Sequence, residues 1–251
     1  MKTIAIHLQK GGVGKTTMAG ALAYELSKRG RTILVDCDPQ GNASSWHLKD
    51  APDRELADVL AGKATAREAI AATTAPGLDI LATFGLDGGL KLYGETTLSN
   101  EPFILCELMD ELAGQGYEYA ILDLSPGMGR LEKAALIAAA EVVTPMTPEY
   151  FALDGLAIFD AELTKTTKAM RRGPEHRIII VNAFDKRIEQ HRAVADEAAF
   201  MQGRAVFRVP VDPCFRKAQA LHLPAQELPK ESAPKAETTA ALESITEALW
   251  H

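Results

Sequence analysis

Residues 9–17 read Q-K-G-G-V-G-K-T-T, and this stretch decides how the rest of the chain is interpreted. It follows a short apolar run at residues 3–8 and opens a helical pattern that begins near Lys15. A strand, a glycine-rich loop and a helix in this order form a cradle for phosphates, because glycine lets the backbone approach an anion closely. The N–H groups of the loop and the positive end of the helix then point at the phosphates.

The side chains of the loop predict individual roles. The general pattern G-x-x-x-x-G-K-[ST] has glycine where this chain has Gln9, and a second lysine, Lys10, precedes the glycine pair. Lys15 can reach the β- and γ-phosphates, and the Thr16 hydroxyl is placed for Mg²⁺. A glycine-rich turn with incidental lysines is the alternative. We expect the nucleotide to be bound by Lys10, Gly11, Gly12, Val13, Gly14, Lys15, Thr16 and Thr17.

This variant of the loop resembles the ParA/MinD group of P-loop ATPases, in which the earlier lysine reaches the partner's nucleotide across a dimer interface. The resemblance implies this role for Lys10, which would supply a cation in trans as an arginine finger does. It also implies a homodimer that encloses ATP and separates after hydrolysis. The implied fold class is α/β, a P-loop NTPase with a mostly parallel twisted sheet flanked by helices on both faces. We expect a single domain over residues 1–251.

Two aspartates end apolar runs that are typical of buried parallel strands. Residues 36–42, D-C-D-P-Q-G-N, match the first switch of the family, which implies that Asp38 orients the attacking water near Mg²⁺. Asp123 ends the strand expected over residues 119–123 and would hold Mg²⁺ together with Thr16. An Asp-Pro turn is the alternative for Asp38, and a helix cap is the alternative for Asp123. The family more often has two prolines after this strand, whereas this chain has Ser125 before Pro126.

The resemblance also assigns residues to the base and to DNA. Asn182, at the end of the strand expected over residues 177–182, would read the adenine edge, and Pro210 lies where the family passes its backbone around the base. Soj-like members place a basic residue that binds DNA without sequence preference near Arg216 and Lys217. A turn at Asn182 and a solvated surface at the two basic residues are the alternatives.

The remaining pattern predicts the other elements of the fold. Residues 85–94 contain four glycines and are expected to be irregular or only partly helical, and residues 223–234 to form an extended connection. Further strands are expected over residues 32–36, 78–82, 141–145 and 205–209. Helices are expected over residues 16–29, 54–62, 66–72, 101–113, 131–140, 153–170, 184–202 and 235–249.

Composition limits the class of protein. The chain has 251 residues, of which 47% are hydrophobic, and this suits one larger α/β domain. Its three cysteines are unclustered, and the sequence contains no apolar run long enough for a membrane span, so we expect a cytoplasmic protein. The net charge is −7, but residues 165–217 carry 12 Lys/Arg against 6 Asp/Glu. This asymmetry is typical either of an anion-facing surface or of ordinary solvated helices.

The resemblance implies an ATP- and Mg²⁺-dependent ATPase for plasmid or chromosome partitioning. It would dimerise with ATP, bind nucleoid DNA without sequence preference, and be stimulated by a ParB-like partner. A relative that positions a protein cargo has the same chemistry and remains an alternative. A MinD-like membrane protein is disfavoured because residues 235–249 carry one lysine against three glutamates. A reductase like the nitrogenase iron protein needs cluster cysteines, and residues 124–131 contain none.

Overall fold

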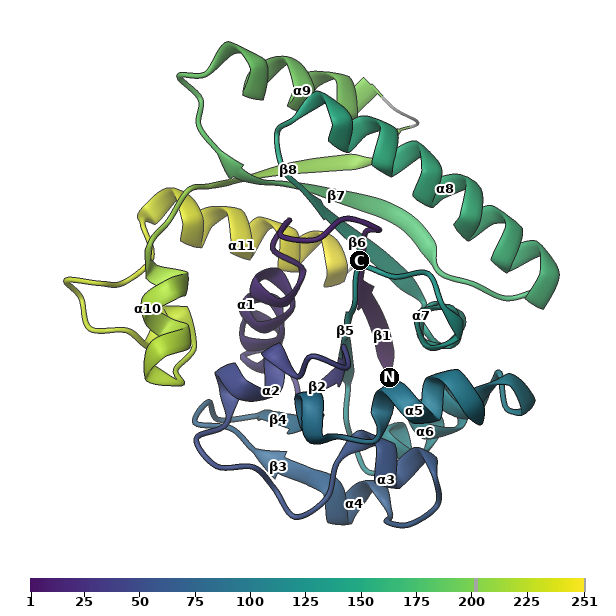
Figure 1. The fold of residues 1–251 in the computed structure, drawn as a ribbon. Coiled ribbons are helices and arrows are strands. Elements are labelled where there is room, and N and C mark those ends of the chain that lie inside the picture. The colour runs from purple at the N-terminus through teal and green to yellow at the C-terminus, as the bar shows by residue number, and fades with distance from the viewer. Residues whose placement is uncertain (201–202, 251) are drawn as a thin grey trace.

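The computed structural model describes residues 1–200 and 203–250, apart from the side chain of Ser99. Its described strands are β1 Lys2–Ile6, β2 Thr32–Cys37, β3 Ile70–Ala72, β4 Leu78–Leu81, β5 Tyr119–Leu124, β6 Glu141–Met146, β7 Glu175–Phe184 and β8 Ala205–Pro210. They form one sheet in the order β3-β4-β2-β5-β1-β6-β7-β8 (Figure 1). Every pair of neighbours is parallel except β3 and β4, so the expected mostly parallel sheet is confirmed.

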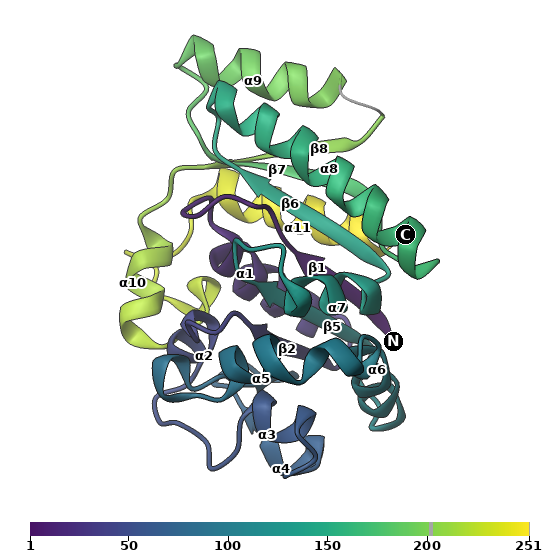
Figure 2. The same ribbon diagram turned by 45° about the vertical axis from the view of Figure 1, so that its right-hand side comes forward.

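Helices cover both faces of the sheet (Figures 1 and 2). One face carries α1 Lys15–Ser27, α2 Asn42–His47, α10 Cys214–Leu221 and α11 Ala236–Trp250. The other face carries α3 Leu56–Leu60, α4 Ala66–Ala69, α5 Leu90–Thr96, α6 Ile104–Gly114, α7 Arg130–Ala138, α8 Tyr150–Met170 and α9 Glu189–Phe200. None of the helices in the described ranges has the length and apolar character needed to cross a membrane.

The sequence of β1 shows why both faces are covered. Ile4 and Ile6 pack into the core beneath α1 and α11, whereas Ala5 packs into the core on the opposite face. Successive side chains of a strand point to opposite faces, so a strand buried on both sides reads as a continuous apolar run. The central strands therefore lie where an unbroken run of hydrophobic residues predicted them.

The structure corrects one predicted helix. The helix expected over residues 66–72 ends at Ala69, and Ile70–Ala72 instead forms β3, which pairs antiparallel with β4. Thr65 and Glu68 form a capping box that stabilises the short α4, and the next residues gain the ladder hydrogen bonds of the sheet edge. Ladder bonds to a distant strand are invisible to helical periodicity, so this prediction was wrong.

Other boundaries shifted as well. The helix expected over residues 184–202 starts at Glu189, because β7 continues to Phe184 and a turn closed by Asp185 and Arg187 follows. Its predicted end at Gln202 lies outside the described residues. Residues 85–94 are partly helical, as expected, with a 3₁₀ turn at Gly85–Asp87 and the start of α5. The connection over residues 223–234 contains a further 3₁₀ turn at Ala225–Glu227.

Candidate nucleotide-binding site

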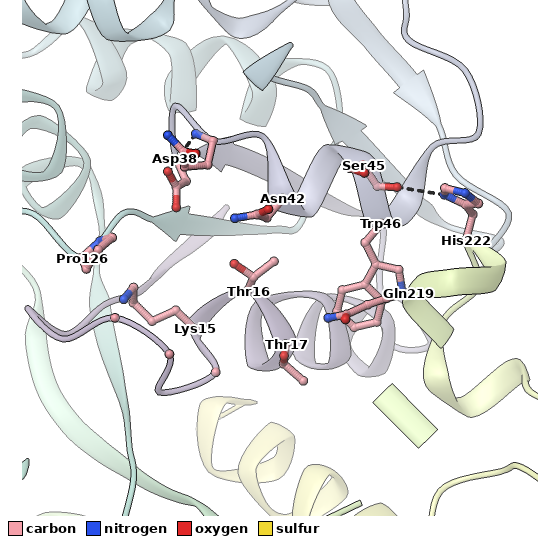
Figure 3. A pocket seen from close by; sticks show the side chains of 14 residues that line it. Lys15, Thr16, Thr17, Asp38, Asn42, Ser45, Trp46, Pro126, Gln219 and His222 are labelled. Atoms are coloured by element: carbon pink, nitrogen blue, oxygen red, sulfur yellow. Dashed lines mark hydrogen bonds between the residues drawn. The ribbon is translucent and has the colours of Figure 1, made fainter. Parts of the chain in front are cut away.

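A cavity of about 650 Å³ opens beside the carboxyl ends of β1, β2 and β5, where parallel sheets bind their ligands. Figure 3 shows Lys15, Asp38 and Pro126 at one end of this cavity, and Trp46, Gln219 and His222 at the other. The volume lies within the range of small-molecule pockets. Its remaining lining residues are Gly11, Gly12, Gly14, Thr16, Thr17, Gln40, Asn42 and Ser45.

The glycine-rich loop between β1 and α1 has the geometry that its sequence predicts. Gly12 and Gly14 have φ angles of 73° and 94°, in the left-handed region that favours glycine. A Cβ atom at Gly14 would lie 2.2 Å from Nδ2 of Asn182, so this position also lacks the room for a side chain. The loop therefore leads directly into α1, whose N-terminus faces the cavity.

Lys15 is folded back over this loop. Its Nζ donates a hydrogen bond to the carbonyl oxygen of Lys10 at 2.8 Å. Burial lowers the pKa of Lys15, and the charges of Asp123 and Asp38 oppose that shift. A cation held among loop carbonyls and carboxylates is ready to exchange these partners for phosphate oxygens.

Asp38 extends from the end of β2 into the cavity (Figure 3). Its Oδ1 accepts a hydrogen bond from the backbone N–H of Gln40 at 2.9 Å, which holds the following turn. Burial raises its pKa. The structure thus places Asp38 at the same end of the cavity as Lys15, and its role towards water stays a prediction.

Asp36 and Asp123 lie side by side in the register of β2 and β5. Asp36 accepts hydrogen bonds from the backbone N–H and the hydroxyl of Ser44, at 2.8 and 2.7 Å, and burial raises its pKa to about 6. Asp123 is fully buried, and among the described residues neither of its oxygens has a hydrogen-bond partner of normal geometry. Desolvation raises the pKa of Asp123 well above its ordinary value, and Asp36 adds to the shift.

An unpaired buried carboxylate is costly, and a cation beside it removes the cost. Asp123 lies near Thr16, whose hydroxyl opposes the pKa shift of the carboxylate, and Thr16 lines the cavity. The described residues contain no cluster of three His, Cys, Asp or Glu side chains arranged for a metal. Thr16 and Asp123 therefore fit Mg²⁺, which takes few protein ligands and completes its shell with water and substrate phosphates.

Lys10 points away from this cavity, towards the start of α8. Its Nζ lies 2.6 Å from Oε2 of Glu149 and 3.4 Å from the hydroxyl of Thr147. The lysine lowers the pKa of Glu149. Sequence reasoning did not predict this contact, because 139 residues separate its partners along the chain.

Asn182 and Pro210 do not line the cavity. Asn182 lies behind the glycine-rich loop, where its Nδ2 donates to the carbonyl oxygen of Val13 at 2.9 Å. Pro210 ends β8 and borders a separate cavity of about 520 Å³ together with Phe184 and Val211. The structure thus places Asn182 against the phosphate loop but leaves both assigned contacts to a base as predictions.

Arg216 and Lys217 lie on the exposed side of α10. Lys217 donates a hydrogen bond to the hydroxyl of Ser232, and the structure places both basic side chains outside the cavity. The other end of the cavity is built instead by Trp46, Gln219 and His222, which the sequence analysis missed. Trp46 and His222 come from segments whose hydrogen-bonded residues are 177 positions apart in the chain, so no local pattern marked them.

Ser125, which replaces a proline common in the resembling family, shapes the loop after β5. Its hydroxyl donates to Oε1 of Glu132 at 2.5 Å and accepts from the N–H of Gly127 at 3.1 Å. Glu132 also accepts from the N–H of Gly129 at 2.8 Å, in the first turn of α7. The serine therefore ties this loop to the helix by hydrogen bonds.

Comparison with known proteins gives consistent matches. A family model described as an AAA domain matches residues 1–177. The chain is 31% identical over 229 residues to the chromosome partitioning protein ParA of Caulobacter vibrioides, covering 88% of this chain and 84% of the relative. It is 34% identical over 241 residues to the chromosome-partitioning ATPase Soj of Thermus thermophilus, covering 89% of each.

The solved structures agree on the fold. McdA of Cyanothece in complex with ATP superposes with a TM-score of 0.85 and 18% identity, covering all of this chain and 96% of the other. The structure and the comparisons agree on the family. The structure has a phosphate-binding loop on a parallel sheet and a buried aspartate at the end of the adjacent strand, and the comparisons give a matching family model and relatives above 30% identity. The chain therefore belongs to the ParA/Soj group of P-loop ATPases.

Proposed function

We propose that this chain is an ATP-dependent, dimerising switch that partitions DNA, binds DNA without sequence preference in its ATP state, and is stimulated by a ParB-like adaptor. One observation carries the proposal: a single cavity joins Lys15 and Thr16 to Asp38. It lies above the buried carboxylate of Asp123, which has no hydrogen bond of normal geometry within the described part of the chain. Two relatives named for chromosome partitioning support the biological role. A cytoplasmic, nucleoid-associated location follows from that role.

The proposed chemistry is the hydrolysis of ATP to ADP and phosphate. Lys15 leaves the carbonyl of Lys10 and contacts the β- and γ-phosphates, while Thr16 and Asp123 hold Mg²⁺. When bound, Mg²⁺ neutralises charge on the phosphates. Asp38 accepts a hydrogen bond from the attacking water and orients it. Asn182 and Pro210 take the base, for which the Oδ1 atom of Asn182 is an acceptor.

The proposed dimer brings two such cavities face to face. Lys10 crosses to the partner's nucleotide and stabilises charge in the transition state. At the start of α8, beside the Lys10 contact, Tyr150 and Phe151 are 54% and 81% exposed. Two adjacent aromatic side chains in solvent suit a surface that becomes buried on association.

The proposed DNA contact is electrostatic. Arg216 and Lys217 lie on the exposed side of α10, and a dimer presents two copies of this face. Contacts of this kind neutralise phosphates and release counterions, so DNA affinity falls steeply with salt. Two basic residues in each protomer give a modest surface, and this makes the affinity dependent on dimerisation.

The test is fluorescence anisotropy with a labelled duplex of random sequence, with ATP or ADP, at two salt concentrations. We expect binding with ATP, weak binding with ADP, and a loss of binding at the higher salt. Lys15→Ala abolishes the ATP-dependent signal, whereas Arg216→Ala lowers affinity and reduces the salt slope by about 1 per protomer. Equal binding in the two nucleotides would reject the proposed switch.

A further inference from the structure

The short helix α2 stands between the phosphate end of the cavity and α10. It begins at Asn42, directly after the turn that holds Asp38. Ser44 ties it to β2 through both hydrogen bonds to Asp36, and its hydroxyl also accepts from the N–H of Thr83 at 2.8 Å. The N-terminal half of α2 is therefore fixed to β2, the strand that Asp38 directly follows.

The other end of α2 contacts α1 through Trp46, which is only 2% exposed. A Cβ atom at Gly20 of α1 would lie 2.7 Å from Cζ3 of the Trp46 ring and 2.6 Å from Nε2 of His47. The missing side chain at Gly20 thus leaves the space in which α2 packs on α1. Trp46 therefore packs on the helix that carries Lys15 and Thr16 at its start.

Two hydrogen bonds connect this end of α2 to the end of α10. Nε1 of Trp46 donates to the carbonyl oxygen of Leu223 at 2.9 Å. Nδ1 of His222 lies 2.8 Å from the carbonyl oxygen of Ser45, so this nitrogen carries the proton (Figure 3). The described residues show no other direct side-chain hydrogen bond between these two segments.

His222 also has an unusual backbone. It follows the last turn of α10 with φ 55° and ψ 38°, a left-handed conformation that is uncommon without glycine. The hydrogen bond to Ser45 holds the ring of this strained residue against α2. Because Trp46, Gln219 and His222 all line the cavity, a ligand that fills it contacts the α2–α10 junction and the phosphate loop together.

We infer that Trp46 and His222 are positioning residues that couple the nucleotide in the cavity to the orientation of α10, and so to the basic face of Arg216 and Lys217. This inference rests on the proposed function. The turn at Asp38 responds to the phosphates, α2 moves with that turn, and the two hydrogen bonds carry the movement to α10. DNA affinity in the ATP state then depends on the α2–α10 junction as well as on dimerisation.

The first experiment measures the ratio of DNA affinities with ATP and with ADP, at saturating nucleotide so that altered nucleotide affinity does not enter. Trp46→Phe keeps a buried aromatic ring and removes the Nε1 donor, and His222→Gly removes the ring while allowing the backbone conformation. Each is expected to reduce the ratio by about 2- to 13-fold, the equivalent of one net hydrogen bond. Sedimentation in ATP checks that the variants still dimerise.

His222→Asn is the conservative variant, because asparagine tolerates the left-handed region and its amide can donate to Ser45. It is expected to restore most of the ratio that His222→Gly loses. Trp250→Phe is the matched control for Trp46→Phe: Trp250 is 47% exposed on α11, and its loss should leave the ratio unchanged. A merely structural role for the junction would move stability but not this ratio.

A second readout needs no DNA. The chain has two tryptophans, so Trp250→Phe leaves Trp46 as the sole indole fluorophore. Its emission is expected to differ between the ATP and ADP states, whereas Trp250 in the Trp46→Phe variant should not respond. Identical Trp46 spectra in the two nucleotides would overturn the inference.

The outcomes separate the inference from the function on which it rests. If the wild-type protein binds DNA equally with ATP and ADP, both are rejected. If the wild type discriminates and Trp46→Phe and His222→Gly discriminate equally well, the coupling role is wrong and the proposed function stands.

Discussion

The contact between Lys10 and Glu149 predicts how strongly the isolated protomer resists dimerisation. In the proposed dimer, Lys10 would have to leave Glu149 before it could reach the partner's nucleotide. The side chains of Lys10 and Glu149 are 31% and 55% exposed. An exposed ion pair contributes about 0.2–1 kcal/mol, so the two pairs broken in one dimer oppose association by about 0.4–2 kcal/mol. We expect Glu149→Gln to tighten the ATP-bound dimer by about 2- to 30-fold.

The assay is sedimentation velocity across a range of protein concentrations, with a non-hydrolysable ATP analogue so that turnover does not deplete the dimer. Glu162→Gln is the matched control, because Glu162 lies on the same helix, α8, and pairs with Lys165 at 3.8 Å. It makes the same change of charge without a contact to Lys10. Added salt should narrow the difference between Glu149→Gln and wild type, since salt screens exposed charges.

Two results would refute this reasoning. A Glu149→Gln dimer no tighter than the Glu162→Gln dimer would show that Glu149 does not restrain Lys10. A Glu149→Gln dimer weaker than the wild-type dimer would show that Glu149 stabilises the dimer more than it stabilises the isolated protomer.

Three further predictions concern polar groups that are buried or partly buried. Asp123→Asn should raise the stability of the nucleotide-free protein by about 1–3 kcal/mol at pH 7 and abolish ATP hydrolysis, because it removes an unpaired buried carboxylate. Because the pKa of Asp123 is raised in the folded state, the stability of the wild type falls relative to that of the variant as pH rises above about 4. A difference in melting temperature between the two proteins that is the same at every pH would contradict this. Ser125→Ala should cost about 1–3 kcal/mol in urea unfolding by removing a donor to buried Glu132, and a change below about 0.5 kcal/mol would argue against that role. Burial raises the pKa of Asp160, but hydrogen bonds from His176 and Arg204 hold it below its ordinary value, so its stabilisation is present above about pH 4 and lost as pH falls. Asp160→Asn should therefore lower the melting temperature at pH 7 and much less at pH 3.

The central part of the fold could be predicted because its signals are local. The central strands β1, β2, β5 and β6 are buried on both faces and read as apolar runs. The glycine-rich loop needs a left-handed backbone at residue 14, and the sequence has glycine there. Lys15, Thr16 and Asp38 meet at one cavity because they follow the carboxyl ends of β1 and β2, two parallel strands that lie on either side of β5. Motif spacing and sheet topology together were enough to assemble this end of the site.

The parts that were missed depend on contacts between distant segments. Helical periodicity over residues 66–72 gave no sign that Ile70–Ala72 would pair with β4. The α2–α10 junction and the Lys10–Glu149 contact each join residues more than a hundred positions apart. Asn182 illustrates the same point: it lies in the expected strand, although β7 continues to Phe184, and its bond to Val13 could not be foreseen.

The edges of the sheet bear on how copies of this molecule meet. On one side the last strand, β3, has three residues, and on the other β8 ends in a proline that lacks an N–H donor. A three-residue edge strand and an edge strand that ends in proline are poor templates for pairing with a strand of another molecule, which protects against aggregation. Edge-to-edge pairing between two copies of this sheet is therefore disfavoured at both of its borders.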